Sequence, residues 1–263
     1  MGTLVNYSTD KGVAFLTLND PPVNAYTYEM FKELDACILD ARFDDDVHVI
    51  VVTGHGDKFF SAGANINMLR ESDPSFKYYF CLHANETLLR LEHTPKLCIA
   101  ALNGHAVGGG LEIALACDLR IARGGPFRIG LPERNLGVLP GTGGTQRLAR
   151  LIGRSKSIEL MVEGRNVSFE DALPLGLVNK VWEAESHEQF MRKISDYAHQ
   201  FTPPNGAPPG DRPHQAECAE RRRHGARAGL ALERELKTSS SPRATPKGLS
   251  AYLEKRDPNF LAR

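Results

Sequence analysis

The stretch that decides the fold is Asn103–Ala114, which reads NGHAVGGGLEIA. Three consecutive glycines lie between a predicted strand, CIAAL, and an apolar helical segment whose first turn holds Glu112. A glycine turn before a helix leaves backbone N–H groups unpaired at the positive end of the helix dipole. Such a turn can bind a nucleotide phosphate, make a tight structural connection or donate hydrogen bonds to an oxyanion.

Neither phosphate-binding motif fits this stretch. The Walker motif fails because Gly110 and Leu111 stand where it requires Lys and then Ser or Thr. The dinucleotide motif fails because Ile113 stands where its third glycine belongs, and the later stretch Gly141–Arg147 (GTGGTQR) lacks that glycine too. Glu112 then remains either a helix cap or an acid/base beside an oxyanion donor, and the stretch alone leaves both interpretations open.

Two further segments favour acid/base chemistry. Phe59–Leu69 (FFSAGANINML) places small residues at a second strand-to-helix turn, and Gly130–Leu148 puts Glu133 directly after a proline. Together they supply two turns with backbone donors and two glutamates. The sequence has no HExxH zinc motif, so no metal site is predicted. It has no G-x-S-x-G turn either, so no serine nucleophile is predicted. The predicted chemistry is proton transfer by carboxylates with stabilisation of an oxyanion.

The rest of the chain predicts an α/β fold. Asn24–Phe43 has helical spacing, with six residues predicted to face the core: Met30, Phe31, Leu34, Cys37, Ile38 and Ala41. Further helices are predicted at 147–152 and 158–162, and a capping box at 168–171. Predicted strands are 4–8 and 13–18, which form a hairpin, then VHVIVVTG (47–54), KLCIAALNG (96–104), DLRIA (118–122) and GLVNKVWE (176–183). Strands that alternate with helices are expected to be buried on both faces.

Composition narrows the class of protein. The 263 residues contain 32 basic and 32 acidic side chains, so overall charge favours neither nucleic acid nor an anionic membrane as a partner. No secretory signal or apolar run of membrane-spanning length is present. The five cysteines are odd in number and form no CxxC pair, which is typical of buried thiols in a reducing compartment. We therefore expect a cytoplasmic protein.

Three segments in order resemble the crotonase (enoyl-CoA hydratase/isomerase) superfamily: FFSAGANI, NGHAVGGGLEIALACDLRIA and GLPERNLGVLPGTGGTQRLARLIG. The resemblance covers about residues 4–204 and 230–260. It implies an α/β fold with a ββα spiral catalytic core at 1–200 and a C-terminal helical trimerisation segment at 201–263. The implied assembly is a homotrimer or a hexamer built as a dimer of trimers.

The resemblance also implies roles for particular residues. The backbone N–H groups of Ala64 and Gly109 would form an oxyanion hole for the thioester carbonyl of an acyl-CoA. Glu112 would help activate water for attack at Cβ, and Glu133 would give a proton to Cα. Contacts to the substrate are implied for Ala62, Asn65, Ile66, Gly141 and Lys255. No cofactor is expected, because coenzyme A is part of the substrate.

The lead hypothesis is hydration of a trans-2-enoyl-CoA to a 3-hydroxyacyl-CoA, because both glutamates are present. A 3-methylglutaconyl-CoA hydratase, an enoyl-CoA isomerase and a non-catalytic acyl-CoA-binding protein are the alternatives. Asn65 and Asn67 depart from the family, in which many members have Asp and Lys there. The loop before Glu133 is also about one residue longer than the commonest family version.

Two C-terminal windows, 206–227 and 238–246, do not fit the family pattern although their flanks do. Alternative reading frames can encode family-like helices in both windows, so we hypothesise that compensating frameshifts produced them. Residues 206–213 are rich in proline and are not expected to form a helix. Sequencing the coding DNA tests the hypothesis.

Overall fold

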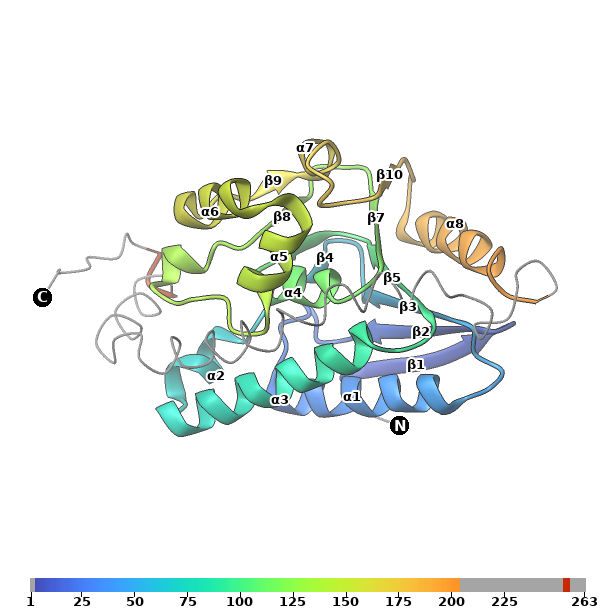
Figure 1. The fold of residues 1–263 in the computed structure, drawn as a ribbon, viewed down its shortest axis with the longest axis horizontal. Helices are drawn as coiled ribbons and strands as arrows, with labels where there is room; N and C mark the ends of the chain where they lie inside the picture. The colour runs from blue at the N-terminus through green and yellow to red at the C-terminus, as the bar shows by residue number, and fades with distance from the viewer. Residues whose placement is uncertain (1–2, 204–252, 256–263) are drawn as a thin grey trace, which may run out of the picture.

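A six-stranded sheet forms the centre of the computed structural model, which describes residues 3–203 and 253–255 (Figure 1). The strand order is β1-β2-β3-β5-β7-β10, in which β1 is antiparallel to β2 and the other neighbours are parallel. The strands are β1 (Val5–Asp10), β2 (Val13–Leu18), β3 (Val49–Gly54), β5 (Leu97–Leu102), β7 (Leu119–Arg123) and β10 (Lys180–Trp182). The predicted hairpin and the four later predicted strands are all present, although β10 is shorter than predicted.

A second, smaller sheet has the order β4-β6-β8-β9. Its strands are β4 (Phe59–Ser61), β6 (His105–Val107), β8 (Arg128–Gly130) and β9 (Val167–Ser168), of which the first three run parallel. Each of β4, β6 and β8 comes directly after a strand of the large sheet and directly before a helical segment. The chain thus repeats a ββα unit, and the predicted ββα spiral is confirmed.

Helices lie on both faces of the large sheet, and others pack against the small sheet (Figure 1). They are α1 (Tyr28–Phe43), α2 (Ile66–Glu71), α3 (Pro74–Glu92), α4 (Gly109–Leu115), the 3-10 helix η1 (Glu133–Leu136), α5 (Gly144–Ile152), α6 (Arg154–Glu163), α7 (Phe169–Ala172) and α8 (His187–His199). Strand β3 divides its side chains by alternation: Ile50 and Val52 pack toward α1 and α3, whereas Val49 and Val51 pack toward α8. All four are fully buried. Burial of each such side chain stabilises the fold by about 1.5–3 kcal/mol relative to leaving it exposed to water.

Helix α1 begins four residues later than predicted. Asn24 has a left-handed backbone (φ 51°), and Thr27 caps the helix by accepting a hydrogen bond from the N–H of Met30. Between them, Tyr26 pairs with Ala64 as an isolated parallel bridge. The segment before α1 is therefore attached to the turn after β4. Within α1, the six residues predicted to face the core are the six that are buried.

The predicted strand, glycine turn and helix around Asn103 also need a correction. Strand β6 lies between β5 and the glycines, so the turn that opens α4 follows the small sheet rather than the large one. Asn103 lies at the change of sheet, and its side chain hydrogen-bonds the backbone at the end of β3 and in the loop that follows it. Its Oδ1 accepts from the N–H of Gly54 at 3.0 Å, and its Nδ2 donates to the carbonyl of Gly56 at 2.7 Å.

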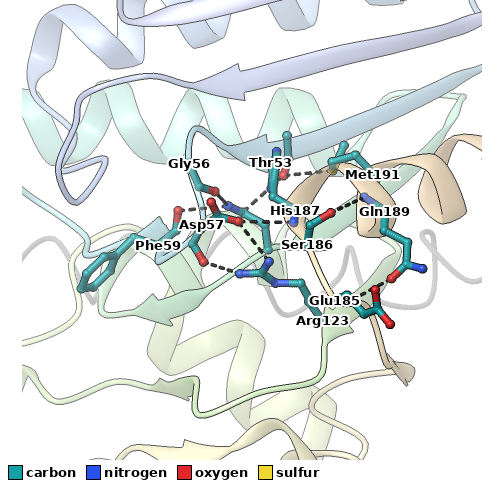
Figure 2. A network of polar contacts seen from close by, with 11 residues as sticks. Thr53, Gly56, Asp57, Phe59, Arg123, Glu185, Ser186, His187, Gln189 and Met191 are labelled. Atoms are coloured by element: carbon teal, nitrogen blue, oxygen red, sulfur yellow. Dashed lines mark hydrogen bonds and ion pairs between the residues drawn. The ribbon is translucent and has the colours of Figure 1, made fainter.

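A polar network joins α8 to the same loop (Figure 2). The guanidinium of Arg123, at the end of β7, donates to Oδ1 of Asp57 at 3.1 Å and also to the Asp57 carbonyl. The backbone N–H of His187, the first residue of α8, donates to the same Oδ1 at 3.3 Å. Asp57 lies between β3 and β4, so this network fixes the chain just before the strand that leads into the candidate site.

Some sequence-based predictions concern residues that lie partly outside the described structure. Cys37, Cys81, Cys98 and Cys117 are buried free thiols, as predicted, and Cys218 lies outside the described residues. No helix in the described part of the chain could cross a membrane. Both atypical windows, 206–227 and 238–246, and nearly all of the predicted trimerisation segment also lie outside it.

Candidate active site

A pocket of about 80 Å³ lies where β4, β6 and β8 end. Because the three strands are parallel neighbours, their carboxyl ends meet at one edge of the small sheet, and the turns after them converge. The pocket is lined by Ala62–Ala64 after β4, by Gly108 and Gly109 after β6, and by Pro132 and Glu133 after β8. Three segments that the sequence singled out separately are thus brought together.

The turn after β4 presents one backbone donor. In this turn Ala62 donates its N–H to a neighbouring loop at 3.0 Å, Gly63 donates to the hydroxyl of Ser61 at 3.1 Å, and Asn65 donates to the Tyr26 carbonyl at 2.9 Å. For the N–H of Ala64, which lies between them, no acceptor is found within residues 3–203 and 253–255. The turn is therefore held on both sides of an amide that remains available.

Asn24 holds the strand that leads into this turn. Its side-chain amide donates to the carbonyls of His55 and Phe59 at 2.9 Å each, and to that of Phe60 at 3.3 Å. Its own carbonyl accepts a hydrogen bond of 2.7 Å from the Ser61 hydroxyl. Asn24 is fully buried, so water cannot hydrogen-bond these groups. Loss of any of these bonds would leave a buried polar group without a partner.

The turn after β6 presents a second donor. Gly108 has φ 56° and ψ −130°, a backbone conformation that other residues rarely adopt. Gly108 is the cap of α4, and Gly109 is its first residue. The N–H of Gly109 therefore has no partner inside the helix. The two turns are in direct contact, since a Cβ added to Gly63 would lie 2.8 Å from the Gly109 nitrogen.

Glu112 lies one turn into α4 with 2 % of its surface exposed. Oε1 accepts hydrogen bonds of 2.8 Å from the backbone N–H groups of Thr142 and Gly144, and Oε2 accepts one from the Thr142 hydroxyl. These donors belong to the loop that opens α5, so the carboxylate also lies at the positive end of that helix dipole. Glu112 is held by another part of the chain and does not cap its own helix.

Side chains behind the Gly141–Gly144 loop hold it in place. Asn85, buried on α3, donates its side-chain amide to the Gly141 carbonyl at 3.1 Å. Arg147 donates from Nη1 to the Thr142 carbonyl at 2.9 Å, and from Nε and Nη2 to one carboxylate oxygen of Glu92 at 3.0 and 2.9 Å. The position of the Glu112 carboxylate therefore depends on an ion pair between α3 and α5.

Glu133 approaches the pocket from the third turn. It opens η1 directly after Pro132 and is 9 % exposed. A Cβ added to Gly108 would lie 3.2 Å from Oε1 of Glu133, so this carboxylate lies beside the turn that carries the Gly109 amide. Glu112 and Glu133 line the same pocket from two different strand ends. Two carboxylates and two available amides can together exchange protons and stabilise negative charge on oxygen.

The remaining walls of the pocket are largely apolar. They are formed by Ile66, Leu69, Phe80, Cys81, Leu136, Val138 and Leu139, together with Tyr26 and Thr142. Seven of the nine predicted site residues line the pocket: Ala62, Ala64, Ile66, Gly109, Glu112, Glu133 and Gly141. Asn65 does not, because its side chain caps α2 by accepting from the N–H of Met68 at 3.1 Å. Lys255 is exposed and is not part of the pocket wall.

Comparisons with known proteins show which family the chain belongs to. The model of the enoyl-CoA hydratase/isomerase family matches residues 8–263. The chain belongs to this family. It is 34 % identical over 259 residues to a probable enoyl-CoA hydratase of Bacillus subtilis, covering 97 % of this chain and 98 % of that one. A short-chain-enoyl-CoA hydratase of Clostridium acetobutylicum is 43 % identical over 185 residues, or 70 % of each chain.

The fold of this family member matches a solved structure as well. The enoyl-CoA hydratase structure from Geobacillus kaustophilus superposes with a TM-score of 0.74 at 38 % identity, covering 99 % of this chain and 97 % of that one. In the described part of this hydratase/isomerase family chain, no group of three or more His, Cys, Asp or Glu side chains could hold a metal ion. The prediction that no cofactor is needed remains a prediction.

Sequence reasoning missed two polar residues of the site, Tyr26 and Thr142. Tyr26 is 3 % exposed and comes from the loop before α1, about eighty residues before the glycine turn it contacts. Thr142 adjoins Gly141, which the family resemblance did indicate, but nothing in the sequence shows that its hydroxyl meets Glu112. Only the tertiary fold brings these groups to the pocket.

Proposed function

We propose that this protein hydrates trans-2-enoyl-CoA thioesters to 3-hydroxyacyl-CoA thioesters. The observation that carries the proposal is the convergence of Glu112, Glu133 and the amides of Ala64 and Gly109 on one pocket. Membership of the enoyl-CoA hydratase/isomerase family supports it, as do relatives named as hydratases.

In the proposed reaction the thioester carbonyl accepts hydrogen bonds from the N–H groups of Ala64 and Gly109. This polarises the conjugated double bond and makes Cβ electrophilic. Glu112 takes a proton from a water molecule as the water oxygen forms a bond to Cβ. The π electrons move through Cα to the carbonyl oxygen, where the two amides stabilise the enolate. Loss of one oxyanion donor typically costs about 3–4 kcal/mol of transition-state stabilisation.

The second half of the reaction returns those electrons to carbon. Glu133 in its protonated form gives its proton to Cα, the carbonyl re-forms and the product leaves. Glu112 then holds the proton taken from water and Glu133 is ionised, so exchange of one proton with solvent restores both groups. The apolar walls, from Ile66 and Phe80 among others, exclude other water from the enolate.

Loss of the 2-enoyl thioester absorbance of crotonyl-CoA, and of longer and branched enoyl-CoAs, tests the proposal. We expect hydration by the wild-type chain and a decrease in kcat of about 10²–10⁴-fold in Glu133→Gln. Glu163→Gln, an exposed glutamate at the end of α6, is the matched control and should keep wild-type activity. Turnover of 3-enoyl substrates alone would identify an isomerase, and binding of CoA esters without turnover would identify a binding protein.

We also propose a cytoplasmic homotrimer or hexamer with an acyl-CoA thioester as its small-molecule partner and no added cofactor. The family resemblance supports the assembly, and the four buried free thiols are consistent with a reducing compartment. Light scattering of the purified chain distinguishes a trimer or hexamer from a monomer. Full activity after dialysis against a chelator is expected if no metal participates.

A further inference from the structure

Tyr26 contacts both of the turns that carry the proposed oxyanion donors, and the proposed reaction gives it no step. Its backbone pairs with the turn after β4: its N–H donates to the Gly63 carbonyl at 2.9 Å, and its carbonyl accepts from the N–H of Asn65 at 2.9 Å. These two hydrogen bonds lie on either side of Ala64 and make the isolated parallel bridge between Tyr26 and Ala64. The backbone of Tyr26 thus holds the turn that contains the Ala64 amide.

The side chain of the same residue packs against the turn after β6. A Cβ added to Gly109 would lie 1.8 Å from Oη of Tyr26 and 2.4 Å from both Cε1 and Cζ, and these are the three atoms nearest to it. The phenol therefore fills the space that a side chain at position 109 would need. Because Cβ is one bond from Cα, the phenol is in direct contact with the backbone of Gly109.

The ring of Tyr26 is itself held in place. The residue is 3 % exposed, and its ring meets that of Phe31 edge-on, with centroids 4.7 Å apart. The ring of Phe80 lies against it as well, with centroids 6.1 Å apart. In a close-packed interior such a ring has little room to move, so the Gly109 turn cannot shift toward it.

We propose that Tyr26 is a positioning residue for the oxyanion hole, whose backbone fixes the Ala64 amide and whose side chain fixes the Gly109 amide. The proposal rests on the proposed function, because it concerns the two donors to the thioester carbonyl. Two amides stabilise one oxygen only when both lie at hydrogen-bond distance from the place where its charge develops. These two amides belong to turns after different strands, and one residue in contact with both turns sets their relative position.

The proposal predicts a specific kinetic pattern. Tyr26→Phe removes Oη, the atom nearest to the Gly109 position, and Tyr26→Leu removes the ring as well, while the backbone pairing can remain in both. We expect kcat for crotonyl-CoA to decrease about threefold to tenfold in Tyr26→Phe and about tenfold to a hundredfold in Tyr26→Leu. KM should stay within about twofold, since a displaced amide loses more in the transition state than in the bound substrate. Tyr197→Leu is the matched control, because Tyr197 packs against Trp182 and Phe201, away from the pocket, and kcat should not change.

A double variant tests the contact between the phenol and the Gly109 turn. Gly109→Ala should decrease kcat by about a hundredfold or more, because its methyl group collides with the phenol and displaces the amide. Tyr26→Leu leaves room for that methyl, so the double variant should have a higher kcat than Gly109→Ala alone. A double variant no more active than Gly109→Ala would show that Tyr26 does not set the position of the turn, and the proposal would be overturned.

A second measurement does not depend on turnover. Butanoyl-CoA has no double bond to hydrate, and infrared spectroscopy of butanoyl-CoA labelled with carbon-13 at the carbonyl reports how strongly the oxyanion hole polarises that bond. We expect the carbonyl stretch to fall on binding to the wild type, less in Tyr26→Phe, least in Tyr26→Leu, and as in the wild type in Tyr197→Leu. If the wild-type chain hydrates no enoyl-CoA, the proposed function fails, and the carbonyl stretch still decides the role of Tyr26. No shift in the wild type, or an equal shift in Tyr26→Leu, overturns the proposal.

Discussion

Gly144 donates its backbone N–H to Oε1 of Glu112 at 2.8 Å, so the first residue of α5 holds the carboxylate that α4 carries. The contact leaves no room for a side chain: a Cβ added to Gly144 would lie 2.9 Å from that same oxygen. Two helices that are separate in sequence therefore share one functional group. This contact makes the position of Glu112 sensitive to a single methyl group.

Gly144→Ala is the first prediction. The added methyl pushes the carboxylate away, so we expect kcat for enoyl-CoA hydration to decrease by about tenfold or more, as in other cases of a misplaced catalytic group. The free energy of unfolding should hardly change. The higher helix propensity of alanine, by up to about 1 kcal/mol over glycine, offsets the cost of moving the Glu112 carboxylate. Steady-state kinetics and a urea unfolding curve on the same sample check both halves. Wild-type kcat in this variant would show that the carboxylate adjusts without cost.

The sequence predicted the large sheet and α1 because their patterns are long and regular. Strands β3 and β5 are continuous apolar runs, and α1 repeats its apolar residues at helical spacing. Helix α3 was missed, although it is longer than α1, because its buried face includes the polar residues Asn85 and Thr87. The strands of the small sheet have only two or three residues, which is too short to show a period.

The candidate site was predictable where one short motif supplies several of its residues. Glycine turns and their adjoining glutamates stand together in sequence, so Gly109 and Glu112 could be indicated without a structure. Tyr26 and Thr142 could not, because each one's contribution depends on which distant group it touches, the Gly109 turn for Tyr26 and the Glu112 carboxylate for Thr142. The motif indicated the residues that we propose to react, and only the fold shows what holds them.

Asn24→Asp is expected to destabilise the protein. The substitution keeps the size of the side chain but replaces its NH₂ group, which donates to three backbone carbonyls, with an oxygen that repels them. We expect the free energy of unfolding to decrease by about 3 kcal/mol, since a fully buried group loses its partners. Urea unfolding measures the change. Asn19→Asp is the control: Asn19 makes an exposed hydrogen bond to Thr3, and a change below about 0.5 kcal/mol is expected.

The environment of His187 predicts that the free energy of unfolding decreases as the pH falls. Burial lowers the pKa of its imidazole, and the positive charge of Arg123 lowers it further against the opposing charge of Asp57 (Figure 2). Its Nδ1 is buried without a hydrogen-bond partner in the described structure. The unfolded chain therefore takes up the proton first as the pH falls. The contribution of neutral His187 is complete above the unfolded pKa, about 6.5, and is lost as the pH falls through the lower folded value.

This prediction is checked with His187→Gln, which does not titrate. Urea midpoints measured between pH 5 and pH 8, about one and a half units on either side of the unfolded pKa, should fall less steeply toward acid in the variant than in the wild type. His55→Gln removes an exposed histidine whose positive charge also lowers the His187 pKa, so this variant should change the slope less than His187→Gln does. Parallel curves for wild type and His187→Gln would contradict the assignment of this slope to His187.

Arg147→Lys tests whether the ion pair behind the site acts on the site. Arg147 is 6 % exposed in its side chain and donates from three nitrogens, two to Glu92 and one to the Thr142 carbonyl. Lysine keeps the charge but cannot span both acceptors, so one is left unpaired and the free energy of unfolding should decrease by about 2 kcal/mol. Because Thr142 holds Glu112, kcat should decrease as well, with little change in KM.

Arg70→Lys, in an exposed pair with Glu71, should change neither stability nor kcat. A loss of stability at wild-type kcat would mean that the Gly141–Gly144 loop keeps Glu112 in place without the arginine.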